Sequence, residues 1–268
     1  MRMVVLMEDT CGNLQCACEH GLSVYIDTGR HKLLVDTGAS GKTWDNAEKL
    51  GISLSEVDTL ILSHGHYNHS GGIPEFCKMN QRAAVYMQRT ALLDYYHNER
   101  YIGIDKEIGA LKSVVLLDGD LRIDGEISVF TGITGRKYWP KSNVGLSVRK
   151  DGLDIQDSFL HEQCLVVQGK KSLLVSGCAH NGILNILDRY REIYGEAPGV
   201  VFSGFHMMKK TDYTEQEKDI ICRTAEMLAE EDILFYTGHC TGSKAFNLMK
   251  PIMKDKLVQI HCGMEIWV

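Results

Sequence analysis

The chain has 268 residues, of which 44% are hydrophobic and 24% charged. This composition is that of an ordinary globular protein and excludes disordered and collagen-like classes. The formal net charge of −6 gives no general attraction to phosphate backbones, so we expect no nucleic-acid partner. No apolar run approaches the ~18 residues needed to cross a bilayer, and the N-terminus lacks the pattern of a signal peptide. We therefore expect a soluble, cytoplasmic protein with no membrane partner.

Apolar periodicity and turn residues predict the elements of the first half of the chain. A helix ends at residues 47–50 before Gly51, and another begins near Pro74. The tyrosine-rich residues 90–112 are expected to be mostly helical, and residues 134–151 to form a polar loop. Strands are expected at residues 2–7, 22–27, 32–35, 57–62 and 83–87, and three short antiparallel strands with Asp-Gly turns at 114–117, 121–123 and 127–130.

The second half repeats this style. Residues 163–168 and 172–176 read as a hairpin, and Thr214 with Glu217 forms a capping box at the start of a helix. The remaining predictions are helices at 181–194, 214–231 and from 244, and strands at 199–203, 233–236, 258–260 and 265–268. Because strands and helices alternate within two comparable halves, we expect one domain, residues 1–268, with sheets packed between helical layers.

Nine cysteines are scattered from Cys11 to Cys262. A chain of this size needs no disulfide staples, so in a reducing cytosol we expect most of the nine to be thiols that are buried or bind a metal. The spacing of Cys11, Cys16 and Cys18 matches no standard zinc or iron–sulfur pattern, and these three are expected to be surface or core thiols.

Three histidines, His64, His66 and His69, lie within six residues directly after the apolar strand predicted at residues 57–62. A strand end holds the backbone rigidly, and side chains at i and i+2 point to the same side. Neutral imidazole is a common metal ligand, and zinc accepts nitrogen donors. The cluster therefore predicts a metal site rather than three solvated loop histidines.

Three further strands end in a small residue followed by a histidine, at His180, His206 and His239. The carboxyl ends of neighbouring strands meet at one edge of a sheet. Each of these histidines alone could be structural, but together with the first cluster they form a candidate ligand set.

Residues 64–69 read His-Gly-His-Tyr-Asn-His and resemble the H-x-H-x-D-H signature of the metallo-β-lactamase superfamily. The resemblance extends through residues 19–23, 33–38, 63–72, 177–183, 205–206 and 238–242. These segments look like one branch, which contains proteins named 7,8-dihydropterin-6-methyl-4-(β-D-ribofuranosyl)-aminobenzene-5′-phosphate synthase and others named only metal-dependent hydrolases. The resemblance implies an α+β fold, a four-layer αββα sandwich with metal ions at one edge.

The resemblance also implies a ligand set. His64 and His66 would bind a first ion, and His69 a second ion, with Asn68 and His239 beside it. Zinc is the expected ion, in one or two copies, with iron or manganese as alternatives.

Two positions depart from the usual family pattern. Cys178 stands where the superfamily usually has a bridging aspartate, and residues 130–151 contain no histidine for the third motif, so His180 is expected to replace it at the first ion. His206 stands where related phosphodiesterases carry a strand-end histidine, and it is expected to be catalytic, binding substrate or transferring a proton.

Asn68 is the departure with the largest consequence, because it occupies the position of a catalytic, metal-binding aspartate. An asparagine offers only a neutral carbonyl oxygen and cannot take up a proton. The loss of one negative charge is expected to weaken the second ion. The sequence leaves open whether the residue is natural or engineered.

A divalent ion lowers the pKa of a bound water toward neutrality and so supplies hydroxide. The expected function is therefore metal-dependent hydrolysis of a phosphoester or related ester in a small molecule. Two alternatives stay open: a di-iron redox protein, and a ligand-binding member impaired by Asn68. The oligomeric state is not indicated.

Overall fold

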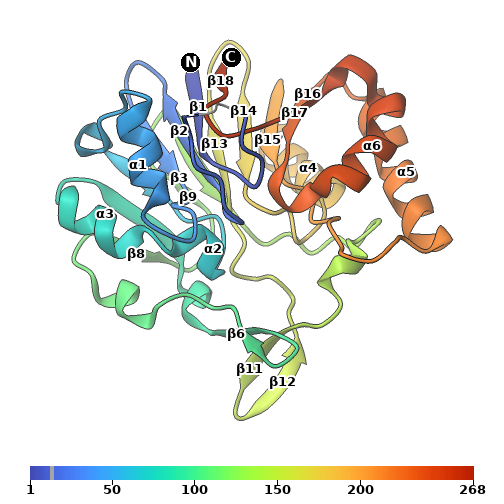
Figure 1. Ribbon diagram of the computed structural model, residues 1–268, viewed down its shortest axis with the longest axis horizontal. Helices are drawn as coiled ribbons and strands as arrows, with labels where there is room; N and C mark the ends of the chain where they lie inside the picture. Colours follow the sequence, from blue (N-terminus) through green and yellow to red (C-terminus); the bar gives the residue numbers. More distant parts are fainter. Residues whose placement is uncertain (13–14) are drawn as a thin grey trace.

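Two facing sheets with helices on their outer sides make up the structure, a computed structural model that describes residues 1–12 and 15–268. Figure 1 shows the layers edge-on: α1 and α3 on the left, the two sheets in the middle, and α4, α5 and α6 on the right. The four-layer α+β sandwich expected from the resemblance is confirmed. None of the helices in the described residues is long and apolar enough to span a membrane.

The first large sheet has the order β18-β1-β2-β3-β4-β5-β8. Its last strand in sequence, β18, pairs antiparallel with β1, so the two ends of the chain lie side by side (Figure 1). The strands are β1 (Arg2–Met7), β2 (Ser23–Asp27), β3 (Lys32–Val35), β4 (Thr59–Ile61), β5 (Ala84–Gln88), β8 (Val114–Leu117) and β18 (Glu265–Trp267).

The second large sheet has the order β17-β16-β15-β14-β13-β10-β9. Strands β14 to β17 run parallel to one another, whereas β13 pairs antiparallel with β10 and β14. The strands are β9 (Leu121–Arg122), β10 (Ile127–Phe130), β13 (Cys164–Val167), β14 (Leu173–Ser176), β15 (Val200–Ser203), β16 (Leu234–Thr237) and β17 (Leu257–Gln259).

The helices begin and end where local chemistry favours it. Thr214 and Glu217 form the predicted capping box of α5, and Gly195 ends α4 in the left-handed conformation. The α-helices are α1 (Lys42–Lys49), α2 (Tyr67–Ser70), α3 (Ile73–Met79), α4 (Ile183–Tyr194), α5 (Glu215–Glu230) and α6 (Gly242–Met253). The 3-10 turns are η1 (Leu54–Glu56), η2 (Arg89–Leu92), η3 (Lys106–Ala110), η4 (Lys141–Asn143), η5 (His239–Thr241) and η6 (Lys254–Lys256).

The layering explains why the central strands are apolar at nearly every position. In β1, Met3 and Val5 point into the core between the two sheets, whereas Val4 and Leu6 pack beneath the helices of the first half. Successive side chains of a strand point to opposite faces, and both faces of this sheet are covered. One apolar layer therefore lies between the two sheets, and another lies beneath the helices on each outer side.

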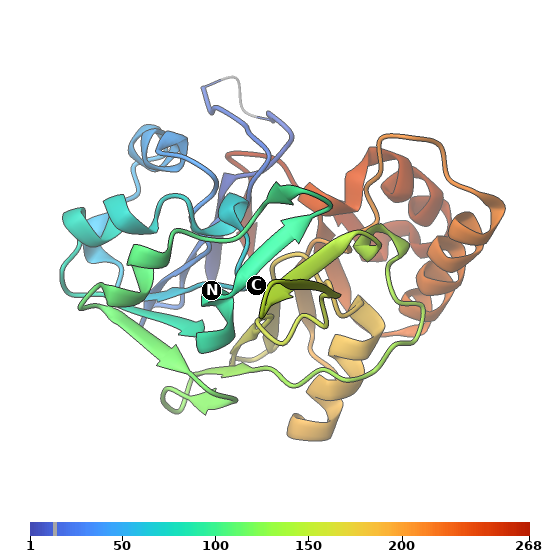
Figure 2. The ribbon, with the colours of Figure 1, turned by 90° about the horizontal axis from the view of Figure 1, so that it is seen from below.

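The helical prediction for residues 90–112 is wrong. This segment contains β6 (Asp94–His97) and β7 (Arg100–Tyr101), which join β11 (Leu146–Lys150) and β12 (Leu153–Gln156) in a small third sheet. The expected loop at 134–151 accordingly includes η4 and β11. Tyr95 is buried and Tyr96 is half-buried, an alternation that suits a strand with one covered face. Figure 2 shows this sheet in front of the two large sheets, across the line where they meet.

The antiparallel arrangement predicted for residues 114–130 is half right. Residues of β9 pair with β10 as expected, but β8 pairs parallel with β5 in the other sheet. The chain therefore passes from the first sheet to the second after β8. The side-chain amide of Gln88 donates to the backbone carbonyl of Gly119 in this crossing. An Asp-Gly pair predicts that the chain turns, but it does not predict which strand the next segment pairs with.

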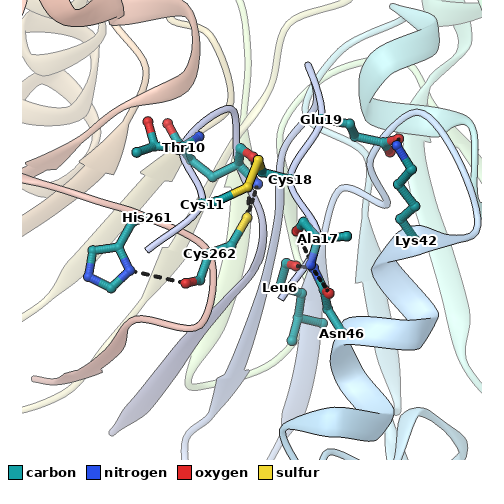
Figure 3. Close-up of a disulfide and its surroundings, with 11 residues drawn as sticks. Leu6, Thr10, Cys11, Ala17, Cys18, Glu19, Lys42, Asn46, His261 and Cys262 are labelled. Carbon is teal, nitrogen blue, oxygen red and sulfur yellow. Dashed lines mark hydrogen bonds and ion pairs between the residues drawn. A yellow bond between two sulfur atoms is a disulfide. The ribbon is translucent and has the colours of Figure 1, made fainter. Parts of the chain in front are cut away.

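The expectation that Cys11, Cys16 and Cys18 are all surface or core thiols is wrong for two of them. Cys11 and Cys18 form a disulfide, shown in Figure 3, and Cys16 is a buried thiol between them in sequence. The disulfide closes the loop that follows β1. Disulfides are rare in reducing compartments, so this bond counts against the cytoplasmic location, which stays a prediction.

Candidate metal centre

The predicted ligands follow strand ends that meet at one edge of the sandwich. His64 comes three residues after β4, and Cys178 and His180 follow β14 in the facing sheet. His206 follows β15, and His239 follows β16. Since the parallel strands β14, β15 and β16 end at the same edge, their following residues converge on the histidines of the first half.

The first ion group consists of His64, His66 and His180. All three side chains are buried, and one ligand atom from each lies within 4.8 Å of the others. The Nε2 atoms of His64 and His180 are 3.3 Å apart. The structure therefore brings together the three histidines assigned to the first ion.

Hydrogen bonds on the far side of these rings fix which nitrogen carries the proton. His180 Nδ1 lies 3.0 Å from Asn143 Oδ1, which can only accept. His64 Nδ1 lies 2.8 Å from Ser63 Oγ, whose own proton is donated to Asp36. Both rings are thus protonated on Nδ1, and two Nε2 lone pairs face each other, an arrangement that a cation between them would stabilise.

His66 completes this group with a polar atom that lacks a partner. Its Nε2 is buried and has no hydrogen bond to any described residue. The neighbouring His161 is fully committed elsewhere: its Nδ1 accepts from the backbone of Gly65, and its Nε2 lies 3.0 Å from Asp157 Oδ2. An unsatisfied buried imidazole nitrogen costs free energy unless something binds it, and a metal ion would satisfy it.

The second ion group consists of His69, Cys178, His239 and Asn68, all buried. Cys178 Sγ lies 3.2 Å from His69 Nε2, and Asn68 Nδ2 lies 3.2 Å from His239 Nε2. Cys178 also shares a potential ligand cluster with His64 and His69, and another with His239 and Cys240. Its sulfur therefore lies between the two ion groups, at the place expected of a bridging ligand.

Asp36 supports both groups from the end of β3. Its Oδ2 accepts from His69 Nδ1 and Ser63 Oγ, each at 2.7 Å, and its Oδ1 accepts from the Ser63 backbone at 2.7 Å. Burial raises the pKa of Asp36 to about 7, although the hydrogen bonds from Ser63 oppose this rise. A cation at His69 would favour the carboxylate form.

The electrostatics of the site fit a cation. Burial, together with neighbouring histidines, lowers the pKa of the four imidazoles His64, His66, His69 and His180 well below the usual range. These rings are therefore neutral at pH 7, and each keeps one nitrogen lone pair that can bind a metal ion. Burial raises the pKa of the Cys178 thiol, and Cys240 beside it adds to the rise. Histidine and cysteine are ligands that zinc accepts, so the side chains at this site fit the zinc ions that the family resemblance implies.

His206 lies beside the first ion group rather than within it. Its ring centroid is 4.0 Å from that of His180, and its Nδ1 lies 2.8 Å from Ser142 Oγ in η4. Burial, with the field of nearby histidines, lowers the pKa of His206 to about 3. The ring is neutral and partly exposed at the site, where it can accept a proton or a hydrogen bond.

Sequence reasoning missed the groups behind His239. Asp9 Oδ1 lies 2.5 Å from His239 Nδ1, and Asp9 Oδ2 lies 2.8 Å from His20 Nδ1. Although burial opposes it, hydrogen bonds from His20 and His239 hold the pKa of Asp9 below its usual range. No pattern singled out Asp9, which follows an apolar strand 230 residues away from His239. Asn143 was also missed, since it lies in the loop that lacks the expected third-motif histidine.

Comparison with known proteins agrees with this geometry. A family model described as Metallo-beta-lactamase superfamily matches residues 17–132. The crystal structure of Tm1679, described as a metal-dependent hydrolase of the beta-lactamase superfamily, is 30% identical in sequence, with a TM-score of 0.85 over 100% of this chain and 99% of that one. The chain belongs to the metallo-β-lactamase superfamily.

Two curated relatives from Methanocaldococcus jannaschii span nearly the whole chain. An uncharacterised protein is 28% identical over 99% of this chain and 100% of its own. The 7,8-dihydropterin-6-methyl-4-(beta-D-ribofuranosyl)-aminobenzene-5'-phosphate synthase is 25% identical over 98% of this chain and 95% of its own. The resemblance to the branch that contains this synthase is confirmed. The roles of the individual ligands stay predictions.

Proposed function

We propose that the chain is a metal-dependent hydrolase that acts on a phosphoester or related ester of a small molecule. The observation that carries the proposal is the first ion group, in which two imidazole lone pairs face each other at 3.3 Å and the Nε2 of His66 is unpaired among the described residues. The likeness to Tm1679 supports the reaction class. The synthase relative, named for a phosphate-bearing product, favours a phosphate-bearing substrate.

In this proposal His64, His66 and His180 hold a first ion, and His69, Cys178, His239 and Asn68 a second. A divalent ion there would polarise a phosphoryl or carbonyl oxygen and make hydroxide available at neutral pH. Asn143 and Ser63 hold the first-group imidazoles in the tautomer that directs Nε2 inward. His206 is neutral and faces the same space, so it accepts a hydrogen bond or a proton from substrate or water.

The test joins metal content to turnover. Purified protein is analysed for zinc, iron and manganese per chain, and the metal-loaded and metal-free forms are compared on phosphodiester, phosphomonoester, lactone and thioester substrates. We expect zinc in the loaded form and turnover of a phosphoester that depends on metal. Equal turnover with and without metal on every substrate would contradict the proposal. Iron with visible colour in the isolated protein would instead favour the redox alternative.

A further inference from the structure

Asp9 contacts the second ion group from behind, just past the end of β1. It accepts hydrogen bonds from two imidazoles, His239 Nδ1 on Oδ1 and His20 Nδ1 on Oδ2. With its Nδ1 proton given to Asp9, His239 keeps the lone pair on Nε2. That nitrogen faces Asn68 at 3.2 Å. The Asp9 carboxylate and the Asn68 amide therefore stand on opposite sides of one imidazole.

The backbone around His239 is held against the same end of β1. Glu8, the residue before Asp9, is buried and accepts a hydrogen bond from the His239 backbone N–H at 2.5 Å. A Cβ atom at Gly238 would come within 2.6 Å of the Glu8 carboxylate, so only glycine permits this approach. His239 itself has a left-handed backbone with φ of 48°. Two consecutive carboxylates thus hold His239: Glu8 binds its backbone N–H, and Asp9 binds its ring.

Described residues on both sides of Asp9 are held by further contacts. A disulfide joins Cys11 to Cys18, and Asn46 of α1 holds Ala17 through hydrogen bonds in both directions (Figure 3). Two residues after Cys18, His20 lies at the site, where its ring stacks on that of His239 with centroids 4.8 Å apart. Asp9 is therefore held in place and not an incidental surface neighbour of His239.

We propose that Asp9 is a positioning residue that supplies, through His239, the negative charge that Asn68 withholds from the second ion. A carboxylate behind a metal-bound imidazole fixes its tautomer and orientation and makes it a stronger donor. Asn68 offers the second ion only a neutral oxygen. The chain thus keeps the anionic charge of the site but places it one ring further from the ion. This inference rests on the proposed metal centre.

Zinc and cobalt titrations of four full-length proteins test this inference: wild type, Asp9→Asn, Asn68→Asp and the double variant. We expect Asp9→Asn to weaken binding of the second ion about 10–100-fold, the range for lost partners of metal-bound histidines, and to leave the first ion unchanged. Asn68→Asp in the Asp9→Asn background should restore the second ion. The number of ions bound per chain and the affinity of each binding step report occupancy of the two groups without any assay of activity.

His20→Ala is the matched control, because it removes the other partner of Asp9 and leaves the Asp9–His239 contact in place. It should weaken the second ion less than Asp9→Asn does. Thermal unfolding of each metal-free variant checks the fold, and Asp9→Ser replaces Asp9→Asn if the latter does not fold.

The outcomes separate the inference from the proposed function. Wild-type affinity for the second ion in Asp9→Asn, equal weakening of both ions, or no rescue by Asn68→Asp would each overturn the role of Asp9 alone. A wild-type protein that binds one ion also overturns it, yet leaves a mononuclear hydrolase possible. A wild-type protein that binds none overturns both.

Discussion

The two ion groups differ in what stands behind their imidazoles. In the first group the partners of His64 and His180 are a hydroxyl and an amide, from Ser63 and Asn143. In the second group the partners of His69 and His239 are the carboxylates of Asp36 and Asp9. Neutral partners only orient a ring, whereas a carboxylate also adds negative charge.

This difference in partners matches a difference between the ligands of the two groups. The first group offers three imidazoles that burial keeps neutral, and it needs no further donor to hold an ion. The second group has a neutral amide at Asn68, where the family signature has an aspartate, and its Cys178 sulfur lies between the two groups. Negative charge behind the ligands offsets what is missing among them. The same reasoning makes the second ion the more sensitive to changes outside the ligand set.

Replacing His66 with alanine tests the first group and should have the largest effect. It removes one of three donors, so we expect loss of the first ion and a fall in turnover of about 10³-fold or more, because such an ion contributes several kcal/mol to the reaction. Metal analysis and kcat measure both. His97→Ala, at an exposed histidine of β6, is the control and should change neither. Full metal content in His66→Ala would remove the distinction between the groups.

Replacing His206 with alanine tests whether this histidine, which lies next to the first group, is itself a metal ligand. We expect both ions to stay bound and kcat to fall about 10²-fold, the lower range for loss of a proton-transferring side chain. Ser142→Ala, which removes only the partner of His206 Nδ1, should have a smaller effect in the same direction. If His206→Ala loses metal, His206 is a ligand and the first group has four members.

The smallest expected effect comes from a carboxylate–imidazole contact far from any ion. His31 lies 2.9 Å from Asp124 and 3.2 Å from Asp58. Burial lowers the pKa of His31, but the hydrogen bonds that its ring donates to Asp124 and Asp58 outweigh this effect and raise the pKa overall. This stabilisation is fully present below the unfolded pKa of His31 and is lost as pH rises through the higher folded pKa.

His31→Gln should therefore lower the Tm of the metal-free protein at about pH 6 and change it less at about pH 8, where His31 is mostly neutral in the unfolded chain. Thermal unfolding at the two pH values measures the difference. A larger effect at the higher pH would reverse the assigned sign. The change in Tm shows how much a carboxylate–imidazole contact contributes to folding stability where no metal ligand is involved. The effect of Asp9→Asn on the Tm of the metal-free protein can then be compared with it.

Much of the candidate site was predictable because its ligands follow strand ends. His64, His66 and His69 form a dense local pattern, and the strand-end histidines His180 and His239 repeat a local signal. The apolar runs before them predicted the strands correctly. Residues 90–112 were mispredicted because their strands are short and belong to a small sheet whose partners lie some 50 residues further along the chain. The single domain of two similar halves stays a prediction.

The sequence by itself determined the donor types, their order along the chain, the change at Asn68 and the layered fold, because each depends on patterns a few residues long. Apart from Ser63, which adjoins His64 in the sequence, only the tertiary structure decided which groups hydrogen-bond to the metal-binding candidates from behind. Asp9 meets His239 across 230 residues, and Asn143 meets His180 across 37. Neither contact leaves a local trace, since an isolated Asp or Asn in a loop has the same short-range preferences whether or not it faces an imidazole. The packing of the two sheets brings these side chains within hydrogen-bond distance of the imidazoles, and it thereby decides which imidazoles have a carboxylate behind them.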